Sequence, residues 1–491
     1  MVQRGRRADV ELVEDDDAPA GPSGAPEHAG RRPWTRRRRR AAAVAAVAVV
    51  GALLAAQSLS DARERAVLAD LRAVPGVLDP LPDGPRPLWR TSADRLPVPV
   101  LPSGSVLLGA RLSPAGTALV ALDPATGADA WTLPLSAPPA DAPDALGTPL
   151  PRCAASPAPA DVLPPRLLCL VTDAWQRDAG LLPQEVPPTT SRLLVVRTSD
   201  GAVVADHVVD AAPGAPATSV ALLDDVAVLG HPVDAGLVVR GVDPASGAEL
   251  WRHGARPGGG VRAVLPRHVA AVDGAVVVPG PDGLDLLDAH GGLLRHVPVP
   301  AGAVTEWARR ADGVLQVGVR DGGSWRLVGR ERDVLLPGPP VHVPVDDGRA
   351  GTVVLAASDR GLHVVDTSTG RQRWSVAAQD VHAALVLRGR VHVVGEEGVT
   401  TYDARTGALL WAWDYGPEET GAGPVLTDGQ DLLVPVGDAE SGEARLLRRL
   451  APSDGRTGAP LRLPPDLTTV AHTGGLLVGW ALSSDEVAAL G

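Results

Sequence analysis

Four segments of this chain carry the same nine-residue pattern, and this repetition constrains the fold more than any other feature. Each segment reads Asp, two variable residues, Thr or Ser, Gly, three variable residues and Trp. An aspartate can accept the N–H groups of a turn, and Gly supplies the positive φ that closes a tight loop. Trp follows Gly by four residues, so it shares the face of Gly on the next strand and can bury its ring there. The predicted hairpins have Asp123, Gly127 and Trp131; Asp243, Gly247 and Trp251; Asp366, Gly370 and Trp374; and Asp403, Gly407 and Trp411.

The spacing of these hairpins indicates a repeat of about 40 residues. Asp243 and Asp366 are 123 residues apart, or three steps of 41, and Asp403 follows after another 37. Weaker copies, which keep the turn and lack the Trp, occur at 197–201, 288–292 and 451–455. About four short strands fit into each period, and the long amphipathic helices of a helical solenoid are missing from the sequence. The pattern therefore predicts an all-β fold, a β-propeller.

Both ends of the chain fit one last repeat. The residues after 468 are typical of three strands, and the segment around Trp89 is typical of a missing outer strand. Joining them would complete one blade from both ends and remove an exposed sheet edge. Counting every candidate repeat unit gives nine blades, but the unit at 301–340 lacks the turn pattern. We therefore expect eight four-stranded blades, within a range of seven to nine. Residues 175–190 are expected to form an inserted surface loop.

An apolar segment precedes this part of the chain. Residues 41–56 carry no polar side chain and follow five arginines, Arg36 to Arg40. About 20 residues span a bilayer, so 41–60 is predicted to be a transmembrane signal-anchor helix. The positive-inside rule then keeps the N-terminus cytoplasmic and places the rest outside the cytoplasm, as a single-pass protein of the cell membrane. A cleaved signal peptide is the alternative; 40 preceding residues are too many for an ordinary one. The expected divisions are a disordered cytoplasmic tail (1–40), the anchor (41–60), a stalk and linker (61–85) and the propeller (86–491).

Charge and cysteine content bear on the partners and the compartment. Residues 1–40 carry a net charge of +3 and the remainder −15. Such an acidic domain is a poor candidate for binding nucleic acid. Cys153 and Cys169 lie within one repeat, on strands expected to be adjacent. Two buried thiols are the alternative, but outside the cytoplasm a disulfide between them is favoured.

The repeated hairpin resembles that of PQQ-like β-propellers, the quinoprotein alcohol dehydrogenase-like superfamily, over about residues 86–491. That superfamily includes quinone-dependent dehydrogenases and non-enzymatic scaffolds of the cell envelope. In it, the Trp of the hairpin packs between neighbouring blades. The resemblance implies this role for Trp131, Trp251, Trp374 and Trp411. Trp89 would take the same role at the closing blade.

The resemblance does not extend to a cofactor site. The dehydrogenases hold pyrroloquinoline quinone beside a calcium ion, with an Asn ligand and a disulfide of adjacent cysteines. This chain has no Asn, and its two cysteines are sixteen positions apart. We therefore expect no cofactor, no metal and no catalytic residue. Asp282, Asp285 and Asp288 are interpreted as turn and strand-end carboxylates.

Other polar and aromatic residues are interpreted structurally as well. His363 and His392 are expected on strand faces. Trp411, Trp413 and Tyr415 form the densest aromatic cluster, on one face of a strand, where an interaction hot spot is conceivable for Trp413.

The function expected from the sequence is therefore binding, without catalysis. The membrane-anchored propeller would serve as a binding or scaffolding module for an envelope protein or a small extracellular ligand. A quinone- or metal-dependent oxidoreductase with non-standard ligands is the first alternative. A sensor that passes ligand occupancy to the N-terminal tail is the second.

Overall fold

The computed structural model describes residues 51–491 apart from several gaps, of which the longest are 100–106, 156–163 and 255–267. Two compact units are distinguished, Met1–Glu64 and Arg65–Gly491, and every strand belongs to the second. In the described part of the chain, no helix combines the length and the apolar character that a membrane crossing requires. The predicted tail (1–40) lies outside the described residues, as does most of the predicted anchor (41–60).

The second unit is all-β, as predicted. Its described residues form nine antiparallel sheets, numbered here in chain order, and a tenth, smaller sheet described below. Sheets 1 to 3 contain β2 (Val98–Pro99), β3 (Leu107–Ser113), β4 (Gly116–Leu122) and β5 (Asp129–Ser136); β7 (Arg152–Ala154), β8 (Arg166–Thr172), β11 (Ser191–Arg197) and β12 (Val203–Val208); and β13 (Ser219–Leu223), β14 (Val226–Val233), β15 (Gly236–Val242) and β16 (Glu249–His253). Sheets 4 to 6 contain β17 (Ala270–Val272), β18 (Ala275–Pro279), β19 (Gly283–Leu287) and β20 (Leu293–Pro298); β21 (Val304–Arg309), β22 (Leu315–Asp321), β23 (Ser324–Val328) and β24 (Asp333–Leu336); and β25 (Val353–Ser358), β26 (Gly361–Asp366) and β27 (Gln372–Val376). Sheets 7 and 8 contain β28 (Ala383–Leu387), β29 (Arg390–Val394), β30 (Gly398–Asp403) and β31 (Leu409–Asp414); and β32 (Glu419–Gly421), β33 (Leu426–Thr427), β34 (Leu432–Asp438), β35 (Ala444–Leu450) and β36 (Leu461–Arg462). Sheet 9 contains β37 (Thr469–Thr473), β38 (Leu476–Trp480), β39 (Glu486–Leu490) and, from the start of the unit, β1 (Pro87–Ser92), which precedes the short 3-10 helix η1 (Ala93–Arg95).

The described residues thus form nine repeat sheets where eight were expected, at the upper limit of the expected range. The additional one is sheet 5, from the unit at 301–340 that lacks the turn pattern. Its strands are specified by burial instead: Trp325 and Leu327 of β23 are 5 % and 7 % exposed and pack against sheet 6. Alternating apolar residues can fix a sheet without the repeated turn.

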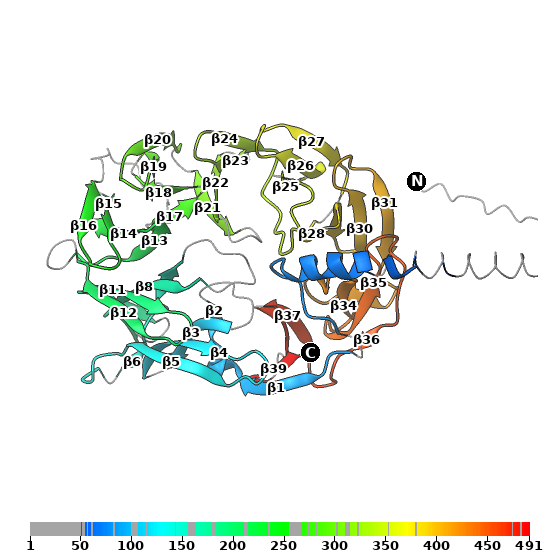
Figure 1. Ribbon diagram of the computed structural model, residues 1–491, viewed down its shortest axis with the longest axis horizontal. Helices are drawn as coiled ribbons and strands as arrows, with labels where there is room; N and C mark the ends of the chain where they lie inside the picture. The colour runs from blue at the N-terminus through cyan, green and yellow to red at the C-terminus, as the bar shows by residue number, and fades with distance from the viewer. Residues whose placement is uncertain are drawn as a thin grey trace, which may run out of the picture. The chain divides into compact units, whose positions relative to one another are not determined.

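The nine sheets close into a ring. β1 pairs with β39 in antiparallel register, which gives the closure by both chain ends that the sequence predicted. A cluster of buried apolar side chains fills each boundary between consecutive sheets, including the one between sheets 9 and 1. Figure 1 shows the strands following one another around this ring in chain order.

The middle strands explain why the sequence is so rich in Val and Leu. On β34, Leu432 and Val434 face sheet 7, whereas Leu433 between them faces sheet 9, and all three are fully buried. A strand covered on both faces must be apolar at every position, so it reads as a continuous apolar run without alternation.

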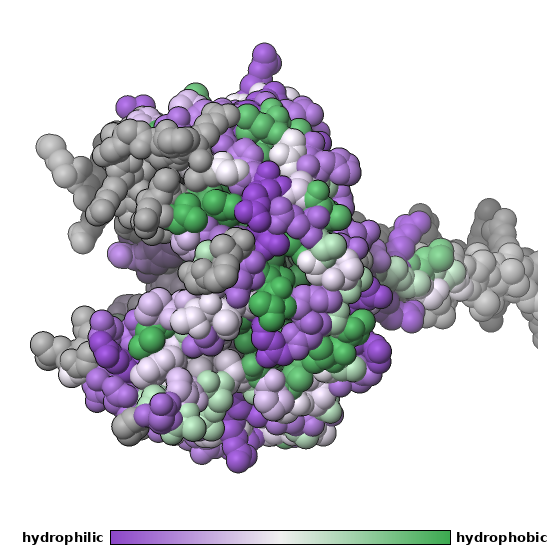
Figure 2. All heavy atoms as spheres, turned by 90° about the vertical axis from the view of Figure 1, so that its left-hand side faces the viewer, coloured by the Kyte–Doolittle hydropathy of each residue, from purple (hydrophilic) through white to green (hydrophobic). Residues whose placement is uncertain are grey.

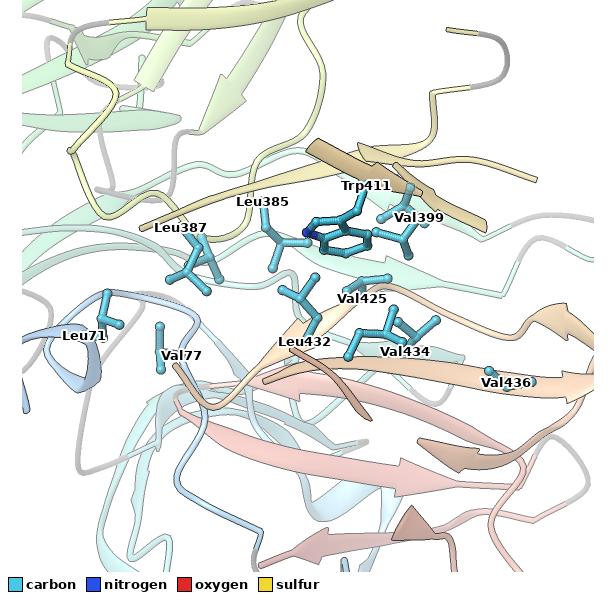
Figure 3. Close-up of a cluster of buried hydrophobic side chains, with 13 residues drawn as sticks. Leu71, Val77, Leu385, Leu387, Val399, Trp411, Val425, Leu432, Val434 and Val436 are labelled. Carbon is cyan, nitrogen blue, oxygen red and sulfur yellow. The ribbon is translucent and has the colours of Figure 1, made fainter. Parts of the chain in front are cut away.

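The segment before β1 is part of this core. Residues 62–72 are helical, and Leu71 and Val77 pack among Leu387, Leu432 and their neighbours between sheets 7 and 8 (Figure 3). The N–H of Leu78 donates to the carbonyl of Thr427 at 2.8 Å. Leu78 and Leu81 then join the cluster between sheets 8 and 9. The region expected to be a stalk and linker therefore contributes to the ring from Leu71 onward.

This packing predicts a selective loss of stability when Leu78 is truncated. Leu78 is 2 % exposed, so Leu78→Ala should cost about 2–5 kcal/mol of unfolding free energy. Leu335→Ala removes the same atoms from a side chain that is 71 % exposed, and should cost under about 0.5 kcal/mol. Urea unfolding of the two variants measures the difference. Equal midpoints would mean that the segment is not part of the folded core.

Candidate binding site

The repeated turn is built as its residue types require. In the last copy, the carboxylate of Asp403 accepts the N–H of Thr406 and its hydroxyl, both at 2.8 Å. These bonds, led by the hydroxyl, lower the pKa of Asp403. Gly407 has φ +73° and donates its N–H to the carbonyl of Asp403 at 2.9 Å. The Asp and Gly of the other three copies occupy the same places: Asp123 with Gly127 (φ +69°), Asp243 with Gly247 (φ +72°) and Asp366 with Gly370 (φ +69°).

The Trp of each hairpin reaches the next sheet. The indole of Trp374 in sheet 6 covers Gly407 in sheet 7, and its Nε1–H donates to the carbonyl of Ala404 at 2.9 Å. A Cβ on Gly407 would lie 2.7 Å from the indole. Gly407 is therefore needed twice, for its backbone conformation and for the neighbouring ring. The same contact joins Trp89 to Gly127, Trp131 to Gly201, Trp251 to Gly291 and Trp411 to Gly455.

Two repeats without the Trp use another side chain in its place, which the sequence analysis missed. In sheet 2, His207 packs on Gly247 and its Nε2 lies 3.0 Å from the carbonyl oxygen of Ala245. In sheet 4, Arg295 donates to the carbonyl of Gly329 at 3.0 Å. Arg295 follows Gly291 by four residues, so its position in the pattern could have identified it. A planar N–H donor, rather than Trp itself, is the shared feature.

The other candidate residues have structural contacts. The carboxylate of Asp285 lies between His253 (3.3 Å) and His296 (2.7 Å), and Asp288 accepts two N–H groups of its own turn. The ring nitrogens of His363 are hydrogen-bonded to the side chains of Ser358 and Gln372. Trp413 meets Tyr415 edge-on at 5.2 Å, and both pack against the cluster between sheets 7 and 8. Among the described residues, no group of three or more His, Cys, Asp or Glu is placed to hold a metal.

The predicted disulfide is confirmed. Cys153 and Cys169 lie opposite each other on β7 and β8 and are bonded, with Cα atoms 4.1 Å apart. Closing a loop of this length stabilises the fold by about 3 kcal/mol in the chain-entropy model. The bond fastens the inner strand of sheet 2.

The insertion in the same repeat has more structure than the expected surface loop. Residues 175–190 contain a hairpin, β9 (Trp175–Arg177) and β10 (Gln184–Val186). β9 also pairs with β6 (Ala145–Gly147), which lies between sheets 1 and 2 in the chain. Asp173 accepts the N–H groups of Thr189 and Thr190 and so closes the base of the hairpin. The result is a small sheet, β10-β9-β6, added to the ring. The prediction failed here because the pairing partner of β9 is about 30 residues away in sequence and belongs to another loop.

A cavity of about 480 Å³ lies beside this small sheet. Its walls come from the ends of β5 and β8, the approach to β7, β10 and the residue before β13. Arg152 and Glu185 are its charged lining residues, Ser136, Thr172 and Thr218 supply hydroxyl groups, and the other lining residues are apolar. None of its polar residues was singled out from the sequence.

Exposed apolar side chains do not offer a comparable site on the ring's outer edge. Val203, Leu250 and Leu294 are 44 %, 54 % and 39 % exposed on the outer strands of sheets 2, 3 and 4. On the side shown in Figure 2, hydrophobic residues lie in separate groups between hydrophilic ones. Scattered groups of this kind are ordinary surface. The small sheet and its cavity are therefore the candidate site.

These features define a β-propeller whose sheets are joined by a repeated hairpin of Asp, Gly and Trp. Residues 310–457 match the PQQ_2 family model, whose description is outer membrane protein assembly factor BamB. Among solved structures, BamB from Moraxella catarrhalis is similar to this chain at 17 % identity and a TM-score of 0.36, over 83 % of this chain and 97 % of that one. The quinohemoprotein alcohol dehydrogenase from Comamonas testosteroni is similar at 10 % identity and a TM-score of 0.38, over 84 % and 78 %. No curated protein matches. These two proteins are named for different roles, so the function is argued below from this chain's own residues.

A pair of matched variants tests the contact between Trp and Gly. Gly370 and Gly407 have nearly the same φ, +69° and +73°, but a Cβ on Gly370 would meet nothing within 4 Å. Gly370→Ala should therefore cost only the left-handed backbone, about 1–2 kcal/mol. Gly407→Ala should cost roughly 1–3 kcal/mol more, because the new methyl collides with Trp374. Urea unfolding measures both costs. Equal losses would show that the docked ring contributes no constraint.

Acid should weaken the ring through its buried histidines. His392 is 0 % exposed beside Trp411, and burial, with Arg390 nearby, lowers its pKa to about 3. The unfolded chain binds that proton near pH ~6.5. This contribution to stability is therefore complete above pH ~6.5 and declines as the pH falls toward 3, by up to about 1.4 kcal/mol per pH unit. Burial also lowers the pKa values of His231 and His472, which act in the same direction.

The variant His392→Gln isolates one of these protons. Unfolding free energies measured between about pH 7 and pH 4 should fall less steeply in His392→Gln than in the unchanged protein. The two slopes should differ by up to about 1.4 kcal/mol per pH unit, the slope that one bound proton contributes. His231 and His472 remain in the variant and provide the residual slope. An unaltered slope would show that His392 takes up its proton in the folded state.

Proposed function

We propose that this chain is a membrane-anchored, nine-bladed β-propeller outside the cytoplasm that serves as a binding scaffold for an envelope protein and has no catalytic role. The observation that carries the proposal is the position of an elaborated region. The Asp, Gly and Trp residues of the repeat are engaged in holding the ring together. In the described part of the chain, an added sheet and a cavity of about 480 Å³ lie beside sheets 1 and 2, and variation of this kind on a rigid framework is typical of recognition sites.

Sequence and structure both support the proposed location. The apolar run 41–56 behind Arg36 to Arg40 favours an anchor with the propeller on the far side of the membrane. The bond between Cys153 and Cys169 suits an oxidising compartment. The family matched by residues 310–457 is named for outer-membrane protein assembly, which supports an envelope protein as the partner.

Site-specific crosslinking tests this function. A photo-reactive amino acid is placed at Leu146, which lies on β6 and is 48 % exposed, in the full chain produced in cells. The matched control is position 335, in sheet 5 and 71 % exposed. We expect one crosslinked envelope protein from position 146 and none from 335. The same pattern of products from both positions, or partners that are cytoplasmic, would contradict the proposal.

The enzymatic alternative has its own test. Purified full-length chain should show no visible absorbance from a quinone or haem and should not reduce a dye on addition of an alcohol. A bound chromophore with substrate-dependent dye reduction would replace the scaffold by an oxidoreductase.

A further inference from the structure

The cavity beside the small sheet holds two charges of opposite sign without partners. Arg152 and Glu185 both line it and both are exposed, so it is open to solvent. Neither side chain has a hydrogen bond or ion pair to a described residue, nor do the two pair with each other. Two other arginines on the strands of sheets 1 and 2 are paired, Arg111 with Asp129 and Arg192 with Asp206.

The Arg152 end of the cavity is suited to a carboxylate. The pKa of His268 is lowered, first by burial and then by the positive charge of the Arg152 guanidinium. A carboxylate bound at Arg152 would accept a charge-assisted hydrogen bond from it and offset that positive charge.

The walls are rigid and partly polar. Arg152 adjoins Cys153 of the disulfide, and Pro149, Pro151 and Pro188 restrict the neighbouring backbone. The hydroxyls of Thr172 and Thr218 are not hydrogen-bonded to described residues and can bond to amide groups of a ligand. A preformed site loses little freedom on binding.

The rim favours a chain over a small molecule. Leu150 lines the cavity and Leu146 lies on β6, and they are 40 % and 48 % exposed. Among the described strands, β6 pairs with β9 alone, and an extended segment can add to the open edge of such a sheet. A volume of about 480 Å³ is within the usual range of ligand sites.

We propose that this cavity binds an extended peptide segment of a partner protein that carries one acidic and one basic side chain, with the carboxylate on Arg152 and the cation on Glu185. Apolar side chains between them would lie against Leu150 and the prolines. The inference rests on the proposed scaffold function and specifies the chemistry of the partner.

Fluorescence anisotropy of the purified full chain with labelled, end-capped peptides tests it. The probes are Gly-Arg-Leu-Ala-Leu-Asp-Gly, the same peptide with Arg and Asp exchanged, and a neutral version with Gln and Asn. We expect saturable binding of one charged peptide and at least tenfold weaker binding of the neutral one, as charge-assisted hydrogen bonds require. Lack of saturable binding by both charged peptides would overturn the proposal.

Variants assign the two ends. Arg152→Ala should weaken the affinity for the charged peptide at least tenfold, and should have little effect on the affinity for a peptide whose Asp is replaced by Asn. Glu185→Gln should also weaken the affinity for the charged peptide, and should have little effect on a peptide whose Arg is replaced by Gln. Arg166→Ala, at an exposed arginine on β8, and Glu331→Gln, in sheet 5, are matched controls and should leave affinity unchanged. Equal losses in Arg152→Ala and Arg166→Ala would overturn the assignment.

A second measurement does not depend on variants. In the unchanged protein, the peptide carboxylate should raise the pKa of His268, followed by the NMR shift of its imidazole, whereas the neutral peptide should not. No response of His268 would overturn the proposal for Arg152. If crosslinking from position 146 succeeds while the peptides fail, the scaffold function stands and this site is wrong.

Discussion

The structure depends on one contact repeated around the ring, in which a planar side chain of one sheet lies on the Gly of the next sheet's turn. The turn exposes a flat backbone surface because Gly lacks a Cβ, and the ring's N–H donates to a carbonyl of the same turn, as Trp374 does to Ala404. The contact thus combines burial of a large apolar surface with a satisfied polar group. Each sheet is held by its neighbours, so the stability of the repeat is a property of pairs of sheets rather than of single hairpins.

The sequence predicted the parts of this arrangement that are local. Asp403, Gly407 and Trp411 lie within nine residues, and their types determine the turn and the direction of the next strand. The count of sheets was too low because sheet 5 is fixed by burial of Trp325 and Leu327 against sheet 6. His207 was overlooked because its role is defined by the carbonyl that it reaches in the following sheet, whereas the spacing of Arg295 from Gly291 could have identified that residue.

The candidate site was visible only in pieces. The two cysteines could be paired from the sequence because their strands are neighbours in one repeat. The cavity could not be found, since Arg152, Glu185 and Thr218 come from separate segments that only the folded ring brings together. An insertion does not follow the repeat pattern. The pattern therefore identifies the ring but gives no information about the inserted surface, which differs between chains that share the ring.

Closure of the ring explains why the segment before β1 is buried. Among the described residues, a docked ring or guanidinium is present at seven of the nine boundaries, and none is seen between sheets 5 and 6 or between sheets 8 and 9. The second gap adjoins sheet 9, whose outer strand comes from the other end of the chain. Leu78 and Leu81 fill this boundary, and β1 begins only a few residues later. The pairing of β1 with β39 and the packing of Leu78 and Leu81 both hold sheet 9, and both are contacts between the first and last parts of the unit. The residues before β1 therefore stabilise the boundary where the repeat supplies no Trp.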